Sequence, residues 1–128
     1  MILDSSAIVA IFLKEPGHEE VLQKLADNDA CGIGAPTLVE TTIVLASRLP
    51  FDPSARLQAF LVQSGVQTIP FGEEHAREAA VAYARYGKGR HSAALNFGDC
   101  LSYAVAKLAG QPLLCTGGDF AQTDLELA

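Results

Sequence analysis

The chain opens with MILDSSA, residues 1–7, in which a short apolar run ends on an aspartate followed by two serines. Residues 1–3 are expected to form a short buried strand, and Ser5 or Ser6 to cap the helix that follows. Asp4 would then stand at the carboxyl end of the strand. Because ligand sites of open α/β sheets lie at this edge, the opening stretch predicts both a fold class and the place of a site.

The rest of the chain alternates short apolar runs with longer segments of helical periodicity. This alternation is typical of an α/β fold with a central, mostly parallel sheet of four or five strands flanked by helices. With no internal repeat or linker, residues 1–128 are interpreted as a single domain. Further strands are expected at 31–35, 67–70 and 113–115, with a short edge strand at 124–128. Helices are expected at 7–13, 18–26, 36–48, from 53 through 61, 73–86 and 99–109.

The bulk composition is that of a globular protein without a membrane anchor. The 128 residues suit one hydrophobic core, with 49% hydrophobic and 19% charged residues. The amino terminus has no basic leader, and no window reaches the ~18 unbroken apolar residues of a membrane span. The three cysteines, odd in number and widely spaced, are interpreted as reduced core thiols. We therefore expect a cytoplasmic protein, and the scattered histidines argue against a zinc site.

Four acids fall at special places in this scheme. Asp4 ends the first strand, and Glu40 lies about one turn into the helix after the second. Asp99 begins the helix that leads into the fourth strand, and Asp119 follows that strand. Strand ends and the helix starts after them share one edge of a parallel sheet. The four carboxylates are therefore expected to meet in one cleft.

Taken alone, each acid has a simpler explanation as a helix cap, a turn residue, a solvated helix charge or a loop acid. These explanations do not account for acids recurring where the fold would bring them together. Clustered carboxylates repel one another, and a divalent cation relieves the repulsion. Mg²⁺ and Mn²⁺ prefer such oxygen ligands, and a metal of this kind can activate water for attack on a phosphodiester.

The residues around these acids resemble the motifs of PIN-domain toxins, the ribonuclease half of VapBC toxin–antitoxin pairs. The match follows the family's order and spacing over nearly the whole chain. The matching segments are DSSA at 4–7, LVE at 38–40, LNFGDC at 95–100 with YA at 103–104, and GGDF at 117–120 with TD at 123–124.

The resemblance implies a PIN fold and an endoribonuclease that depends on Mg²⁺ or Mn²⁺. It implies the catalytic acids Asp4, Glu40, Asp99 and Asp119. Of these, Asp4, Asp99 and Asp119 would bind the metal. Ser6 would support Asp4 or serve only as a helix cap, and Asp124 would be a further supporting acid or a surface residue. Position 118 is often polar or acidic in relatives and is glycine here, which leaves open whether Asp119 reaches metal directly or through water.

The resemblance also implies partners. RNA would be the substrate, and an antitoxin protein and a second copy of the chain would form a homodimer and a toxin–antitoxin hetero-oligomer. The antitoxin is expected to place a cationic side chain near the acids. It is expected to use an apolar groove on the early helices, at Ile8, Ile11, Phe12, Val21 and Leu25.

One segment is locally basic although the chain carries a net charge of −6. Residues 83–91 hold three of the nine basic residues, Arg85, Lys88 and Arg90, and lead toward Asp99. They are interpreted as RNA-binding residues, with the segment's two tyrosines as stacking partners. The alternative is a solvated helix end with both tyrosines in the core.

Three other interpretations compete with the nuclease. A phosphoacceptor receiver domain needs an acidic pair after its first strand, where Asp4 is followed by serines, and an acceptor aspartate after the third, where the chain reads Ile69-Pro70-Phe71. An aspartyl-phosphate hydrolase needs a second aspartate where Ser6 stands. A PIN fold that only binds protein, without activity, is the third alternative.

Overall fold

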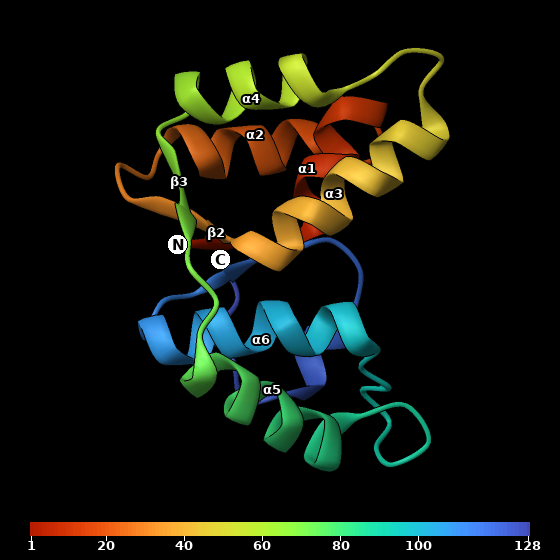
Figure 1. Cartoon of the computed structure of the whole chain (residues 1–128), viewed down its shortest axis with the longest axis vertical. Helices are drawn as coiled ribbons and strands as arrows, with labels where there is room; N and C mark the ends of the chain where they lie inside the picture. Colours follow the sequence, from red (N-terminus) through yellow and green to blue (C-terminus); the bar gives the residue numbers. More distant parts are fainter.

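A four-stranded parallel sheet runs through the middle of the molecule in a computed structural model that describes residues 1–128 (Figure 1). The strand order is β3-β2-β1-β4, and every neighbouring pair is parallel. The expected α/β class is therefore confirmed, with a sheet of four strands. The strands are β1 (Ile2–Leu3), β2 (Cys31–Gly34), β3 (Val66–Ile69) and β4 (Leu113–Leu114).

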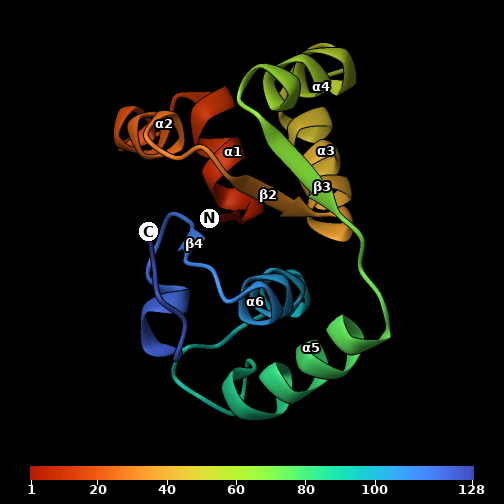
Figure 2. The ribbon, with the colours of Figure 1, turned by 90° about the vertical axis from the view of Figure 1, so that its left-hand side faces the viewer.

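Helices flank the sheet in two groups, which Figure 2 shows on opposite sides of it. The first group is α1 (Ser5–Leu13), α2 (His18–Ala26), α3 (Ala35–Arg48) and α4 (Ser54–Gln63). The second is α5 (Glu73–Tyr86) and α6 (Phe97–Ala109), followed by the short 3₁₀ helix η1 (Asp119–Gln122).

Two hydrophobic clusters cover the two faces of the sheet. Leu3 and Leu114 belong to the cluster with the first group of helices, whereas Ile2 and Leu113 belong to the cluster with α5 and α6. Successive side chains of a strand point to opposite faces, so even a two-residue strand contributes to both clusters. All four of these side chains are buried. The core thus fixes β1, and with it the residue that follows.

Helix α6 begins two residues earlier than expected, because Asn96 rather than Asp99 caps it. The Asn96 side chain accepts a hydrogen bond from the Asp99 backbone N–H at 2.8 Å, and Asp99 Oδ2 accepts one from the Asn96 backbone N–H at 3.0 Å. This reciprocal pair is a capping box. Asp99 therefore stands in the first turn of α6, with one carboxylate oxygen turned back toward the loop.

The strand expected at residues 124–128 does not form. The segment makes a single bridge, between Leu127 and Leu113, with the Leu113 N–H donating to Glu126 O and the Ala128 N–H to Leu113 O, both at 2.9 Å. Its neighbour β4 has only two residues, so it is too short to pair with a longer strand.

The side chains expected to line a groove on the early helices belong mostly to the hydrophobic core. Ile8, Val21 and Leu25 are buried, and Ile11 and Phe12 are partly buried against the same cluster. These side chains therefore hold α1 and α2 to the sheet. The three cysteines are free, as expected, with two of them buried. No helix has the length and apolar character to cross a membrane.

Candidate active site

Asp4 is buried at the carboxyl end of β1, with 4% of its surface exposed. Its backbone N–H donates to Leu114 O at 2.9 Å, which continues the pairing of β1 with β4. Carboxylate Oδ2 accepts from the backbone N–H of Ser6 at 3.1 Å and from its hydroxyl at 2.6 Å. Oδ1 accepts from the hydroxyl of Ser102, on α6, at 2.6 Å. Asp4 therefore caps α1 and also stands at the sheet edge.

Ser6 joins two strand ends through its hydroxyl group. While its proton goes to Asp4, its oxygen accepts the backbone N–H of Thr116 at 3.0 Å. Thr116 lies just after β4, in the segment that leads to Asp119. The contact between Ser6 and Asp4 thus couples the end of β1 to the loop that carries the fourth acid.

Glu40 extends from α3 to the start of α6. Its carboxylate lies so close to Gly98 that a Cβ built on this glycine would stand 2.1 Å from Glu40 Oε2. Only glycine can occupy position 98 with Glu40 in this place. Sequence reasoning missed Gly98, because the helix was expected to begin at residue 99 and this glycine then lay in the preceding loop.

Asp99 is the acid most affected by its surroundings. Burial raises the pKa of its carboxyl group, the Asn96 N–H opposes that effect, and the charges of Asp4, Asp119 and Glu40 raise it further, to about 6. Cys115 is affected by three of the four acids. Burial, and then Asp4, Asp119 and Asp99, raise the pKa of that thiol to about 11. Asp99 thus lies within electrostatic range of each of the other three acids.

No basic side chain neutralises these four acids. The four ion pairs of the chain are Lys24–Glu20, Arg77–Glu73, Arg85–Asp124 and Lys107–Asp124. The donors to Asp4 are neutral hydroxyl and amide groups. Buried charges in proteins are usually paired or bound to a metal, so this end of the sheet is suited to an external cation.

The donor chemistry fits Mg²⁺ or Mn²⁺, because every candidate ligand atom is a carboxylate oxygen. No three acidic, histidine or cysteine side chains lie close enough to hold one ion together. The expected direct set of Asp4, Asp99 and Asp119 is therefore not assembled as a chelate. Mg²⁺ is commonly held by one or two carboxylates, with water and phosphate completing its coordination. The arrangement fits an ion bound in that way.

A sequence model of the PIN domain family matches residues 1–125. The chain belongs to the PIN domain family. Ribonuclease VapC36 of Mycobacterium tuberculosis is 46% identical over 129 residues, covering 98% of this chain and 91% of the relative. Ribonuclease VapC of Mycolicibacterium smegmatis is 42% identical over 125 residues, covering 98% and 97%. Membership of this family excludes the receiver-like and aspartyl-phosphate hydrolase alternatives.

Solved structures share the fold of this PIN domain. Mycobacterium tuberculosis VapC20, described as a sarcin-ricin loop cleaving toxin, superposes with a TM-score of 0.81 at 18% identity, over 99% of this chain and 97% of that one. A chain of a toxin–antitoxin complex from Klebsiella pneumoniae superposes with a TM-score of 0.72 at 18% identity, over 99% and 95%. At such low identity the likeness concerns the fold alone.

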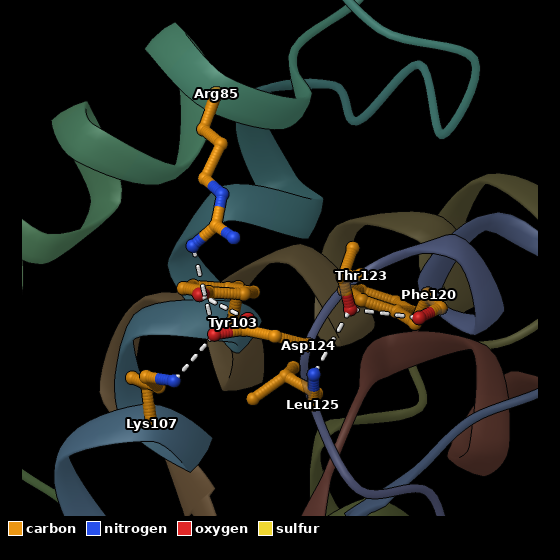
Figure 3. Close-up of polar contacts among 7 residues, drawn as sticks. All are labelled: Arg85, Tyr103, Lys107, Phe120, Thr123, Asp124 and Leu125. Carbon is orange, nitrogen blue, oxygen red and sulfur yellow. Dashed lines mark hydrogen bonds and ion pairs between the residues drawn. The ribbon is translucent and has the colours of Figure 1, made fainter.

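Asp124 is held by side chains of α5 and α6 in this PIN domain (Figure 3). Its Oδ1 accepts from the Tyr103 hydroxyl and its Oδ2 from Lys107 Nζ, both at 2.6 Å. Arg85 stands 3.7 Å from Oδ2. The bonds from Lys107 and Tyr103 lower the pKa of Asp124 to about 2. In place of the expected support for the acid site, this carboxylate ties the C-terminal segment to α5 and α6.

In the basic segment, residues 83–91, one of the three cations forms an ion pair and the other two do not. Arg85 pairs with Asp124 and lies over the ring of Tyr86 at 4.8 Å. Lys88 and Arg90 are exposed and have no ion pair, although the Arg90 guanidinium lies 5.7 Å from the centroid of the Tyr83 ring. Tyr86 is buried, so the stacking role expected for it is wrong, whereas Tyr83 is 41% exposed. The surface open to a ligand is therefore Lys88, Arg90 and Tyr83.

Sequence reasoning also missed the hydroxyl groups beneath Asp4. Ser102 is 1% exposed and lies one turn after Asp99 on α6, and Thr37 is buried one turn before Glu40 on α3. Residues three apart share a helix face, so polar residues at this spacing from a motif acid were the available signal.

Proposed function

We propose that this PIN domain is a metal-dependent endoribonuclease and the toxin of a type II toxin–antitoxin pair. The carrying observation is a buried carboxylate, Asp4, with no basic partner, whose charge acts on Asp99 together with the charges of Glu40 and Asp119. The names of relatives that are 46% and 42% identical over nearly the whole chain support RNA as the substrate.

The side chains divide the work by their surroundings. Asp4 and Asp99, which are held by hydrogen bonds, would bind the cation, and exposed Asp119 would reach it through water. A bound Mg²⁺ or Mn²⁺ would supply an activated water and neutralise charge on the leaving oxygen. Glu40 makes no ion pair in the chain, so we assign its carboxylate the task of accepting the proton of the attacking water.

The products should carry 5′-phosphate and 3′-hydroxyl ends. Cleavage through the RNA 2′-hydroxyl would need an acid and a base poised near neutral pH, which histidine usually supplies. None of the three histidines is among the groups that shift the pKa of Asp99. Water activated at the carboxylates displaces the 3′-oxygen without using the 2′-hydroxyl.

Mapping of cleavage ends tests this function. The purified chain is incubated with total RNA and Mg²⁺ or Mn²⁺, with and without EDTA. We expect 5′-phosphate ends, no cleavage in EDTA, and no cleavage by Asp99→Asn. Asp29→Asn, at an exposed acid away from the site, is the matched control and should stay active. Cyclic phosphate ends or cleavage in EDTA would overturn the metal mechanism. An inactive chain would favour the protein-binding alternative.

The partners belong to the same proposal. Among the solved structures of the same fold are chains from toxin–antitoxin complexes, which supports an antitoxin partner. We expect that antitoxin to place a cationic side chain near the unpaired acids. A second copy of this chain is favoured by an exposed apolar surface on α3 and α6, with Val39 58%, Ile43 63% and Phe97 78% exposed. Apolar patches of this kind mark protein interfaces. Co-purification with the protein of the adjacent gene tests the antitoxin.

A further inference from the structure

We propose that Ser102 is a positioning residue that leaves Asp4 a single acceptor site, on Oδ1, for a divalent cation. This inference rests on the proposed metal-dependent function and goes beyond it. It assigns a role to a residue outside the acidic quartet and states how Asp4 can bind. It is carried by the hydrogen bonds around Asp4 and by the burial of the groups that make them.

The hydrogen bonds to Asp4 can be counted against its capacity. A carboxylate accepts at about four lone-pair sites, two on each oxygen. On Oδ2 both are used, by the backbone N–H of Ser6 at 3.1 Å and its hydroxyl at 2.6 Å. On Oδ1 one is used, by the Ser102 hydroxyl at 2.6 Å. One site is left, so Asp4 binds a cation through one oxygen and not as a bidentate ligand.

The direction of the neighbouring hydrogen bond follows from the same count. The Ser102 hydroxyl has one proton, and it points to Asp4 Oδ1. The Thr37 hydroxyl, 3.2 Å from the Ser102 oxygen, must therefore be the donor in that contact. Thr37 is 2% exposed and Ser102 1% exposed, so water does not replace either bond.

This chain of hydroxyl groups connects the elements that carry the acids. Thr37 lies one turn before Glu40 on α3, Ser102 lies one turn after Asp99 on α6, and Asp4 follows β1. Without the Ser102 hydroxyl, Asp4 loses its hydrogen bond to α6, and Oδ1 is no longer held while Ser6 still holds Oδ2. Partners that orient a metal ligand typically affect metal affinity by 10–100-fold.

Titration of Mn²⁺ into the purified chain by calorimetry at neutral pH tests the proposal. Ser102→Ala should weaken Mn²⁺ binding by about 10–100-fold. Ser102→Cys fills the same space with a weak donor. Its Mn²⁺ affinity should stay as low as that of Ser102→Ala if the hydrogen bond matters, and should return to that of the parent if packing alone matters. Asp4→Asn should abolish the titrated binding, which identifies the site.

Thr41→Val is the matched control. Its hydroxyl is equally buried, on the same helix as Thr37, but it donates to the Thr37 backbone carbonyl at 2.8 Å and does not touch Ser102. Removing it should leave Mn²⁺ affinity within about twofold, although the melting temperature falls through one lost hydrogen bond. Thr37→Val removes only the donor to Ser102 and should lower the affinity less than Ser102→Ala.

The outcomes separate this inference from the proposed function. If the parent chain binds no Mn²⁺, the metal-dependent function and this inference are both overturned. If the parent binds and Ser102→Ala or Ser102→Cys binds within about twofold of it, only the role of Ser102 is overturned. Thermal melts show which variants are folded. Should Ser102→Ala be unfolded, the isosteric Thr37→Val decides, and unchanged affinity there contradicts the proposal.

Discussion

At the scale of single residues, Asp99 shows how the site costs stability. Its pKa rises from 3.8 to about 6 through burial and the neighbouring acids. Between these values the folded chain binds more protons than the unfolded chain, so the free energy of unfolding falls as the pH rises through the window. A tenfold change of proton affinity corresponds to about 1.4 kcal/mol. Above about pH 6 the full loss of unfolding free energy caused by the ionised Asp99 carboxylate is present.

Asp99→Asn should therefore be more stable than the parent at neutral pH although it is inactive. We expect its advantage to be near zero at about pH 4 and to grow to a few kcal/mol at most above about pH 6. Urea unfolding across this range measures it, with Asp29→Asn as control. An advantage that shrinks as the pH rises contradicts the electrostatic assignment.

Gly98 makes a second prediction at this scale. In Gly98→Ala the new Cβ would stand 2.1 Å from Glu40 Oε2, so the carboxylate must move. We expect at least a tenfold loss of RNA cleavage, since proton transfer by a positioned group is worth about 10²–10⁴-fold. Gly72→Ala, where a Cβ meets no atom within 4 Å, is the control and should keep its activity. Equal rates for both variants would remove Glu40 from the mechanism.

At the scale of elements, one carboxylate fastens the C-terminal segment to two helices (Figure 3). Asp124→Asn should lower the free energy of unfolding by about 1 kcal/mol, because the network is partly exposed and screened by solvent. The pKa of Asp124 is lowered from 3.8 to about 2, so its contribution is full above 3.8 and is lost as the pH falls through 2.

Unfolding of Asp124→Asn and its parent at neutral pH and near pH 2 measures this dependence. Glu126→Gln, at an exposed acid without an ion pair, is the control. RNA cleavage by Asp124→Asn should stay within a few-fold of the parent below its melting temperature. A large loss of cleavage without a loss of stability would instead return Asp124 to the acid site.

The end of α5 and the loop after it give a prediction about RNA binding. Lys88→Ala and Arg90→Ala should each weaken binding and flatten its salt dependence by about one phosphate. Arg85→Ala is the matched variant, because its guanidinium is already engaged by Asp124 at 3.7 Å. It should leave the slope unchanged. The RNA-binding assignment fails if all three variants have the parent's slope in filter binding between low and physiological salt.

At the scale of the whole molecule, the apolar surface on α3 and α6 predicts association. Ile43→Lys puts a charge at its centre, where Ile43 is 63% exposed, and should convert a dimer to a monomer. Val62→Lys, at a 68% exposed position on α4, is the control and should leave the dimer intact. Light scattering with size separation gives the masses. A monomeric parent would show that this surface has another partner.

The fold class and the edge of the sheet at which Asp4 stands could be predicted from the amino-acid sequence. Both follow from local pattern, because an apolar run followed by an acid and a helix can be recognised from neighbouring residues alone. The order of strand and helix also predicted that Glu40, Asp99 and Asp119 would approach Asp4. The charges of Asp4, Asp119 and Glu40 all act on Asp99, while the joint metal site stays a prediction.

The groups that hold those acids became apparent from the three-dimensional structure alone. Ser102 donates to Asp4 although 98 positions separate them in the sequence. Asp124 accepts hydrogen bonds from two side chains of α6, although its sequence motif was expected to support the acid site. Such contacts depend on how far α6 is rotated and shifted against the sheet. That position is set by the packing of many core residues together and by no single one of them. The spacing of Ser102 from Asp99 puts both residues on one face of α6, but only the place of that helix against the sheet shows that Ser102 reaches Asp4.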